Sequence, residues 1–248
     1  MAYPDLLSLE PHLQTAKGLV VDLDGTLMSG GQFYPDAKLF LTSLDVPFMI
    51  LSNDSEHTAT ELVQTFERHG IPLDTSQFLL AGVALIEEFA RQNPGARVIM
   101  LASPALRALA TNMGLVLTDE RPTAILVMRD PDFSYQRLAA AVRAVHQGAR
   151  LIVACPDVSH PDPFGVPIPE AGALAAAILA CTGIVDYRVF GKPEPTLFNM
   201  ASQRLGIQPT SCAMVGDNPD TDGLGAHRSG MLFFHISRPE RRHLDRLT

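Results

Sequence analysis

The chain has 248 residues, a net charge of −8 at pH 7 and a hydrophobic fraction of 46%. This length suits one large domain, or a core with an inserted second domain. The acidic charge argues against a surface that follows the phosphates of a nucleic-acid polymer. The longest small-apolar stretch, Ala171 to Cys181, is too short to span a bilayer. The composition therefore favours a globular protein that binds neither nucleic acid nor membrane.

Short apolar runs alternate with longer amphipathic segments along the chain, which predicts an α/β fold with a parallel sheet. The predicted strands cover residues 19–22, 48–51, 78–81, 98–101, 125–128, 151–154, 213–216 and 232–235. The predicted helices cover residues 58–69, 135–146 and 195–205, and a glycine follows the last apolar position of each, as expected of a C-terminal stop.

The first predicted strand ends at Asp22, and a second aspartate follows two residues later, in the sequence Asp22-Leu23-Asp24-Gly25-Thr26. Residues two apart in an extended segment point to the same face. The two carboxylates would therefore repel each other unless a cation or a shared proton lay between them. In α/β proteins, ligands bind at the carboxyl ends of such strands. The motif indicates a phosphate-processing site, although in isolation a turn with two solvated acids explains it about equally well.

Three more polar segments follow predicted strands or precede predicted helices. Ser52-Asn53 could bind phosphate or cap a helix. Lys192, held between a glycine and a proline, could bind phosphate or lie exposed in a loop. The acid-rich loop at residues 216–222 could bind Mg²⁺ or form a polar turn. Because a parallel sheet gathers the loops at its strand ends, the four segments together favour one phosphate site.

The order of acid pair, hydroxyl, lysine and acid loop resembles the haloacid dehalogenase (HAD) superfamily, class IIA, whose members include NagD-like and p-nitrophenylphosphatase-like phosphatases. Supporting matches are Leu51-Ser52-Asn53, Gly148-Ala149-Arg150 with Pro156-Asp157, and Gly191-Lys192-Pro193. The resemblance implies a Rossmann-like core with a parallel five-stranded sheet and an inserted α/β cap domain of class II type. All candidate chemistry lies before about residue 55 or after about residue 190. We therefore expect residues 1–81 and 187–248 to form the core and residues 82–186 the cap.

The resemblance also implies a Mg²⁺-dependent phosphatase that hydrolyses small phosphomonoesters through an aspartyl-phosphate intermediate. Its substrate would be a small phosphorylated metabolite, such as a sugar phosphate, a nucleotide or a phosphoglycolate-like acid, or else p-nitrophenyl phosphate. Asp22 would attack phosphorus. Asp24 would protonate the leaving alkoxide and then deprotonate the water that cleaves the intermediate. Ser52 and Lys192 would complete the catalytic group.

Further site residues follow from the same resemblance. The groups that hold the phosphate would be Leu23, Ser52, Asn53 and Lys192. The ligands of Mg²⁺ would be the carboxylates of Asp22 and Asp217 and the main-chain carbonyl of Asp24. The residues that orient the ion's water molecules would be Asn218 and Asp222.

The cap is expected to close the site and to select the substrate. Its candidate specificity residues are Arg129, Asp130, Cys155, Asp157 and His160. Equally, Arg129 and Asp130 could form a turn, and Cys155 could be an inert buried thiol.

Two segments depart from the pattern of that branch. Ser52-Asn53-Asp54 stands where Thr-Asn-Asn is usual, so that Ser52 keeps the hydroxyl and Asp54 adds a charge near the site, and Ala154-Cys155 replaces the usual Thr-Asn of the cap. The chain also ends soon after His235, so we expect the closing helix of relatives to be shortened or missing.

An alternative is a non-catalytic protein of this fold that senses or binds a phosphorylated ligand or partner. The presence of both Asp22 and Asp24 argues against it, because binding needs no acid or base. A phosphonate hydrolase would need a lysine in the cap, and no lysine lies between Lys38 and Lys192. A homodimer is a further expectation. The three widely spaced cysteines and the absence of a signal-peptide pattern favour the cytoplasm.

Overall fold

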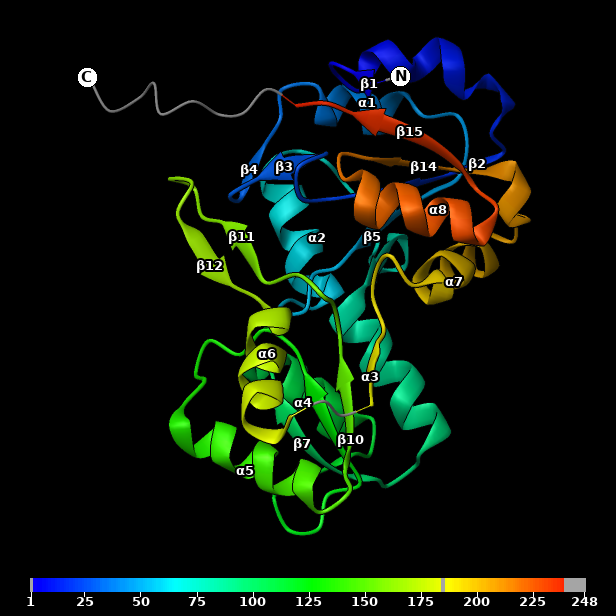
Figure 1. Cartoon of the computed structure of the whole chain (residues 1–248). Coiled ribbons are helices and arrows are strands. Elements are labelled where there is room, and N and C mark those ends of the chain that lie inside the picture. The colour runs from blue at the N-terminus through cyan, green and yellow to red at the C-terminus, as the bar shows by residue number, and fades with distance from the viewer. Residues whose placement is uncertain (1, 184–185, 239–248) are drawn as a thin grey trace.

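The computed structural model describes residues 2–183 and 186–238, which form two α/β parts (Figure 1). The core contains a six-stranded parallel sheet in the order β1-β15-β14-β2-β5-β6. Its strands are β1 (Ala2–Tyr3), β2 (Gly18–Val21), β5 (Phe48–Ser52), β6 (Phe78–Leu80), β14 (Cys212–Gly216) and β15 (Leu232–Ile236). The predicted fold class is confirmed, but the sheet has one strand more than the five expected. The added strand is β1, which has two residues and therefore too little sequence pattern to be predicted.

Helices cover both faces of the core sheet. The first face packs against η1 (Leu7–Thr15), α1 (Ala37–Ser43) and α2 (Ala59–Arg68), and the second against α7 (Pro195–Leu205) and α8 (Leu224–Ser229). Along β2, Leu19 and Val21 point to the first face and are buried against its helices, whereas Val20 is buried against the helices of the second face. Because both faces are covered, the central strands are apolar throughout. Short helical turns are η2 (Thr75–Gln77), η3 (Pro209–Ser211) and η4 (Pro219–Gly223).

The insert contains a second parallel sheet, in the order β13-β10-β9-β7-β8. Its strands are β7 (Arg97–Leu101), β8 (Val116–Leu117), β9 (Ala124–Val127), β10 (Arg150–Val153) and β13 (Tyr187–Val189). Helices α3 (Ala81–Gln92) and α4 (Pro104–Asn112) cover one face, and α5 (Tyr135–His146) and α6 (Ala171–Thr182) cover the other.

The strand β13 bears on the expected end of the insert. It pairs with β10, and Tyr187 lies opposite Leu151. The expected boundary between residues 186 and 187 therefore precedes a strand of the second sheet, and we propose that the insert extends to Val189. The strand is short and partly exposed, so its sequence does not show the buried apolar run that marks the other strands.

Two antiparallel hairpins extend from the two parts toward each other (Figure 1). The core hairpin consists of β3 (Met28–Ser29) and β4 (Gln32–Phe33), and the insert hairpin of β11 (Ser159–Pro161) and β12 (Pro167–Pro169). At Gly30, in the turn of the core hairpin, a Cβ atom would lie only 2.8 Å from the Cα of Pro163. The tip of the insert hairpin therefore touches the core.

The two parts are also joined by a continuous apolar cluster. It runs from Leu51 of the core sheet through Leu85 of α3 to Met100 and Leu126 of the insert sheet. Buried side chains of α3 thus belong to the same cluster as residues of both sheets, so the insert packs against the core through apolar contacts.

Most predicted elements agree closely with the structure. The predicted helices 135–146 and 195–205 have the bounds of α5 and α7, and α2 is one residue shorter at each end than 58–69. In the described ranges, no helix is both long and apolar enough to cross a membrane. The expectation of a shortened closing helix concerns residues 239–248, which lie outside the described part of the chain.

Candidate active site

The candidate site lies at the carboxyl ends of three neighbouring core strands. Asp22 follows β2, Ser52 ends β5 and Asp217 follows β14, and β2 lies between the other two strands. The main-chain N–H of Asp22 donates to the carbonyl of Val215 at 2.9 Å, which ties the start of the aspartate motif to β14. The structure thus gathers segments that are up to 195 residues apart in the sequence (217 − 22).

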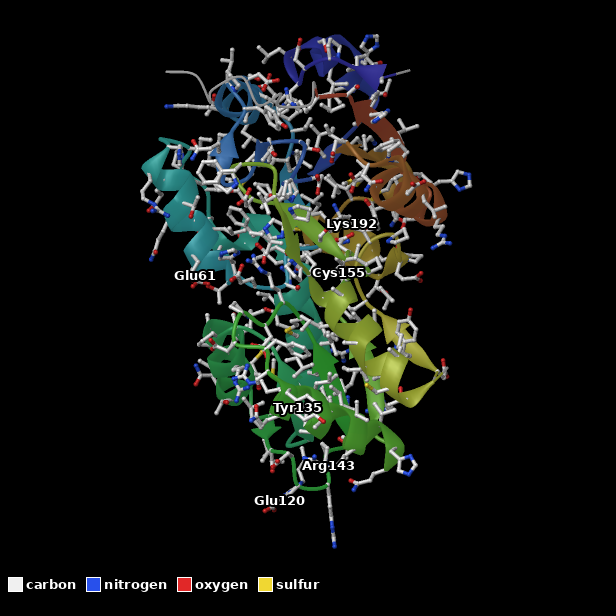
Figure 2. The ribbon with its side chains drawn as sticks, turned by 60° about the vertical axis from the view of Figure 1, so that its left-hand side comes forward. Glu61, Glu120, Tyr135, Arg143, Cys155 and Lys192 are labelled. Carbon is white, nitrogen blue, oxygen red and sulfur yellow. The ribbon has the colours of Figure 1, made fainter. Side chains whose placement is uncertain are left out.

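Lys192 occupies the centre of the site. Its Nζ donates to Asp22 Oδ1 at 2.5 Å and to Asp222 Oδ1 at 2.6 Å, and only 4% of its side chain is exposed. Burial alone would lower the pKa of Lys192, but the charges of Asp22 and Asp222 outweigh burial and raise it above its usual value. The two carboxylates therefore favour the charged form of the lysine, which lies at the level where core and insert meet (Figure 2).

Thr26 is a site residue that the sequence reasoning did not single out. Its Oγ1 lies 3.1 Å from Asp22 Oδ2 and 3.3 Å from Asp217 Oδ1. The two carboxylate oxygens of Asp22 consequently face different partners, Lys192 and Thr26. Gly25, before it, has a φ of +86°, and a Cβ there would overlap the Asp217 carboxylate. The Asp24-Gly25-Thr26 segment thus forms a turn and also places a hydroxyl between two acids.

Three acids in this site could hold a metal ion. Asp22, Asp217 and Asp222 each offer a carboxylate oxygen, and these oxygens lie within 4.8 Å of one another. Burial, together with the charge of Asp22, raises the pKa values of Asp217 and Asp222 to about 7. With Lys192 as the cation among them, the three acids carry an excess of negative charge that a divalent cation would offset.

The loop after β14 shapes this acidic cluster. The main-chain N–H of Asn218 donates to Asp222 Oδ2 at 3.2 Å, while the Asn218 side chain accepts from the N–H of Asp220 at 2.9 Å. The two oxygens of Asp222 are thus contacted by Asn218 and Lys192. This arrangement suits a carboxylate that orients its neighbours.

Asp24 has a different environment. Asp24 is exposed, and the charge of His160 in the insert acts on its carboxyl. Loss of hydration, followed by the charges of Asp22 and Asp54, raises the pKa of Asp24 to about 7. A carboxyl with such a pKa can both give and take a proton near neutral pH.

The segment after β5 joins the site to the insert. Ser52 Oγ accepts from the N–H of Asp54 at 3.0 Å. Asn53 accepts from the N–H of Lys192 at 2.8 Å, and its Nδ2 donates to the carbonyl of Lys192 at 3.1 Å and to Asp157 Oδ2 at 2.9 Å. Asn53 therefore fixes the main chain of the central lysine and contacts the insert at the same time.

The charge of Asp54, the departure from the usual pattern, has a partner. Asp54 Oδ2 lies 2.8 Å from His57 Nδ1, and its Oδ1 accepts from the N–H groups of Glu56 and His57. Burial would raise the pKa of Asp54, but its hydrogen bonds from His57 and Glu56 lower it. The same hydrogen bond raises the pKa of His57 to about 9. The extra negative charge is thus compensated locally.

Three of the five cap candidates face the core. Asp157 contacts Asn53, and burial raises its pKa. His160 Nδ1 lies 2.6 Å from Glu170 Oε1, a contact that raises the pKa of His160, and its charge is felt by Asp24. Arg129 forms an ion pair with Glu56 of the core. These three side chains form the insert's polar face toward the site.

The other two candidates, Asp130 and Cys155, contact Arg137 of the insert and Ser55 of the core, respectively. Arg137 donates to both carboxylate oxygens of Asp130 at 2.5 Å, so Asp130 holds the start of α5. Cys155 is 1% exposed, and burial raises its pKa well above the usual range. The structure therefore favours the alternatives foreseen for both: Asp130 supports a turn, and Cys155 is an inert buried thiol.

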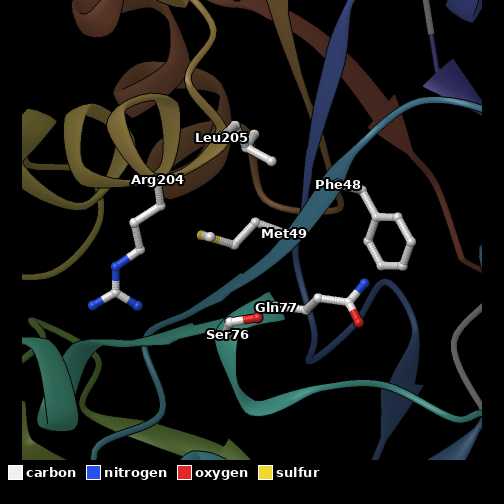
Figure 3. A pocket seen from close by; sticks show the side chains of 6 residues that line it. All are labelled: Phe48, Met49, Ser76, Gln77, Arg204 and Leu205. Atoms are coloured by element: carbon white, nitrogen blue, oxygen red, sulfur yellow. The ribbon is translucent and has the colours of Figure 1, made fainter.

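A separate open hollow of about 440 Å³ lies away from this site (Figure 3). It is lined by Phe48, Met49, Ser76, Gln77, Arg204 and Leu205. Phe48 is the first residue of β5 and Ser52 the last. The hollow is therefore at the opposite end of the sheet from the acids.

Comparisons with known proteins agree with this geometry. A family model described as "haloacid dehalogenase-like hydrolase" matches residues 16–230. The chain belongs to this family. It is 32% identical over 224 residues to an acid sugar phosphatase of Staphylococcus aureus, covering 89% of this chain and 86% of that protein. The family and its phosphatase relatives confirm the prediction of a phosphatase enzyme.

Solved structures of phosphatases resemble most of the chain. A 4-nitrophenylphosphatase from Thermotoga maritima matches with a TM-score of 0.83 and 27% identity, over 89% of this chain and 85% of that one. A glycerol phosphate phosphatase from Mycobacterium tuberculosis, in complex with calcium, matches with a TM-score of 0.81 and 28% identity, over 90% of this chain and 66% of that one. The predicted p-nitrophenylphosphatase-like branch is confirmed.

Proposed function

We propose that this HAD phosphatase hydrolyses small phosphomonoesters with Mg²⁺ through an aspartyl phosphate on Asp22. The observation that carries the proposal is the contact of one buried lysine with two acids, Asp22 and Asp222, beside Asp217. A lysine and several carboxylates at the end of a parallel sheet can bind both a phosphoryl group and a cation.

The residues present fit a divalent ion. Asp22 and Asp217 would bind it with carboxylate oxygens and Asp24 with its main-chain carbonyl, while Asn218 and Asp222 support the loop around it. Burial and the charge of Asp22 raise the pKa values of Asp217 and Asp222 even though the charge of Lys192 lowers them, so the cluster has room for a further positive charge. When bound, Mg²⁺ would offset the repulsion between Asp22 and the substrate's phosphate.

The side chains of the core divide the reaction between them. A carboxylate oxygen of Asp22 would attack phosphorus, while protonated Asp24 gives its proton to the leaving alkoxide. The resulting Asp24 carboxylate would then take a proton from the water that cleaves the aspartyl phosphate. Lys192, Ser52 and the main-chain N–H groups near Leu23 and Asn53 would hold the phosphoryl oxygens.

The insert would select the substrate. Arg129, Asp157 and His160 bring charges of both signs to the face opposite the core site. Polar groups of both signs suit a hydroxyl-rich or otherwise polar leaving group, such as a sugar or glycerol. Sugar phosphates are therefore our first choice, ahead of nucleotides and phosphoglycolate-like acids. A cytoplasmic location and a homodimer stay predictions.

Substitution of the nucleophile tests this function. In Asp22→Asn, an amide replaces the attacking carboxylate, so we expect p-nitrophenyl phosphate and sugar phosphates to show no turnover above background. The measurement is phosphate release by purified protein with Mg²⁺, and with EDTA as the metal-free control. Wild-type rates in Asp22→Asn would exclude the mechanism. If the wild type releases no phosphate from any member of a broad phosphoester panel, the alternative is favoured, a protein that binds a phosphorylated ligand without hydrolysing it.

A further inference from the structure

Arg238, just beyond β15, contacts the aspartate motif from outside. Its Nε and Nη2 donate to the main-chain carbonyl of Thr26 at 3.2 and 2.7 Å, and its Nη1 donates to Asp36 Oδ2 at 2.8 Å. The guanidinium lies 4.2 Å from the centre of the Tyr34 ring, and only 9% of the Arg238 side chain is exposed. We propose that Arg238 is a positioning residue that orients the nucleophile Asp22 through Thr26.

The contacts form a short chain from Arg238 to the reacting carboxylate. Arg238 fixes the carbonyl of Thr26, and the hydroxyl of the same residue contacts Asp22 Oδ2 and Asp217 Oδ1. The other oxygen of Asp22 is held by Lys192. Arg238 therefore controls the one side of the nucleophile that the lysine does not reach.

The motif needs such a hold because it turns sharply. Gly25 has a φ of +86°, a conformation that glycine reaches easily and also leaves easily. The N–H groups of Leu27 and Met28 both donate to the carbonyl of Leu23, which closes the turn, while the Thr26 carbonyl accepts from Arg238. Two N–H groups of one planar guanidinium fix that carbonyl in direction as well as in distance.

A purely structural role would have a different signature. Asp36 also accepts from the N–H of Leu6 at 2.7 Å, so the Arg238–Asp36 ion pair joins three segments and adds stability. Loss of that pair alone would lower Tm and leave kcat unchanged. Loss of orientation would lower kcat of the folded enzyme and leave KM nearly unchanged, because the phosphate ligands remain in place.

The inference rests on the proposed function, and the test compares two matched arginines. Arg204 lines the hollow of Figure 3 and likewise donates to a main-chain carbonyl, of Phe78, and to a carboxylate, of Glu87. The experiment measures kcat and KM with p-nitrophenyl phosphate and Mg²⁺, below the Tm of each variant.

Arg238→Met should lower kcat roughly 10- to 100-fold, as misplacement of a reacting group does. Arg204→Met should keep the wild-type kcat. Arg238→Lys, which keeps the charge, should have a kcat between those of the wild type and Arg238→Met. If Arg238→Met does not fold, the kcat of Arg238→Lys is compared with that of the wild type instead.

A double-substitution cycle then tests the route. Thr26→Val removes the hydroxyl, so adding Arg238→Met to it should change kcat less than twofold further, because the connection is already broken. If the wild type is active, either of two results would overturn this inference but not the proposed function: additive losses of kcat in the double variant, or a wild-type kcat in Arg238→Met. An inactive wild type would overturn both the inference and the proposed function.

Discussion

At the scale of single residues, the two aspartates of the motif differ in what surrounds them. Asp22 is buried between Lys192 and Thr26, whereas the Asp24 carboxyl is exposed and faces the insert. A nucleophile needs a fixed direction, and a proton carrier needs access to leaving group and water. The surroundings therefore match the two roles that the proposed mechanism assigns.

Replacement of Asp24 tests that division. Asp24→Asn should slow phosphate release by about 100-fold or more, because general acid–base catalysis contributes about 10²–10⁴-fold. Mg²⁺ affinity, measured by titration calorimetry, should stay within about threefold of wild type, since the ligand proposed at this position is a main-chain carbonyl. Complete loss of Mg²⁺ binding in Asp24→Asn would contradict the division of roles.

The sequence indicates candidate residues for this site, but it does not indicate the side chains that support them. Asp22, Ser52, Lys192 and Asp217 each follow a strand or precede a helix, and their order is specific. Arg238 lies 212 residues from Thr26, and no local pattern marks their contact. Only folding brings such a pair together.

At the scale of elements, Asp54, which departs from the family pattern, helps to order the loop after β5. Asp54 accepts hydrogen bonds from the N–H groups of Glu56 and His57, and Thr58 then begins α2 with a capping box completed by Glu61. The orphan N–H groups of the loop and of the helix start are thereby satisfied in sequence. Ser52 and Asn53, at the start of this loop, receive a rigid support.

The ion pair in this loop predicts a pH dependence of stability. Asp54 raises the pKa of His57 to about 9, above the value of about 6.5 for an unfolded chain. The folded state thus binds the His57 proton more tightly, so the pair's contribution is full below about pH 6.5 and is lost as pH rises through about 9. Because His57 is partly exposed, we expect a modest effect. Urea unfolding of wild type and His57→Gln should show a stability difference that shrinks across this range. Parallel pH profiles would contradict it.

The elements themselves were largely predictable, for a physical reason. Helices such as α5 and α7 have long apolar periodicity and clear terminal signals, and their predicted bounds match. The strands β1 and β13 consist of two and three residues at sheet edges and are mostly exposed. Their pairing depends on neighbouring strands, so their own residues do not reveal it.

At the scale of the whole molecule, core and insert meet in three ways. The apolar cluster around α3 joins them, the Arg129–Glu56 ion pair and the Asn53–Asp157 hydrogen bond connect their polar faces, and the hairpin tip at Pro163 touches Gly30. The hairpin carries His160, whose positive charge acts to lower the pKa of Asp24. The position of this hairpin should therefore govern how well the insert covers the site.

Two adjacent glycines allow this contact to be tested. Gly30 and Gly31 have φ values of +54° and +75°, so alanine strains the backbone at either position. A Cβ at Gly30 would lie 2.8 Å from the main chain of Pro163, whereas a Cβ at Gly31 would meet nothing within 4 Å. Gly30→Ala should therefore push the hairpin away and lower kcat/KM about tenfold, the loss expected when a small displacement disturbs a closed site. Gly31→Ala should lose stability without this loss of activity. Thermal unfolding and steady-state kinetics with a sugar phosphate measure both effects. Equal changes of kcat/KM in the two variants would show that the hairpin contact does not govern the site.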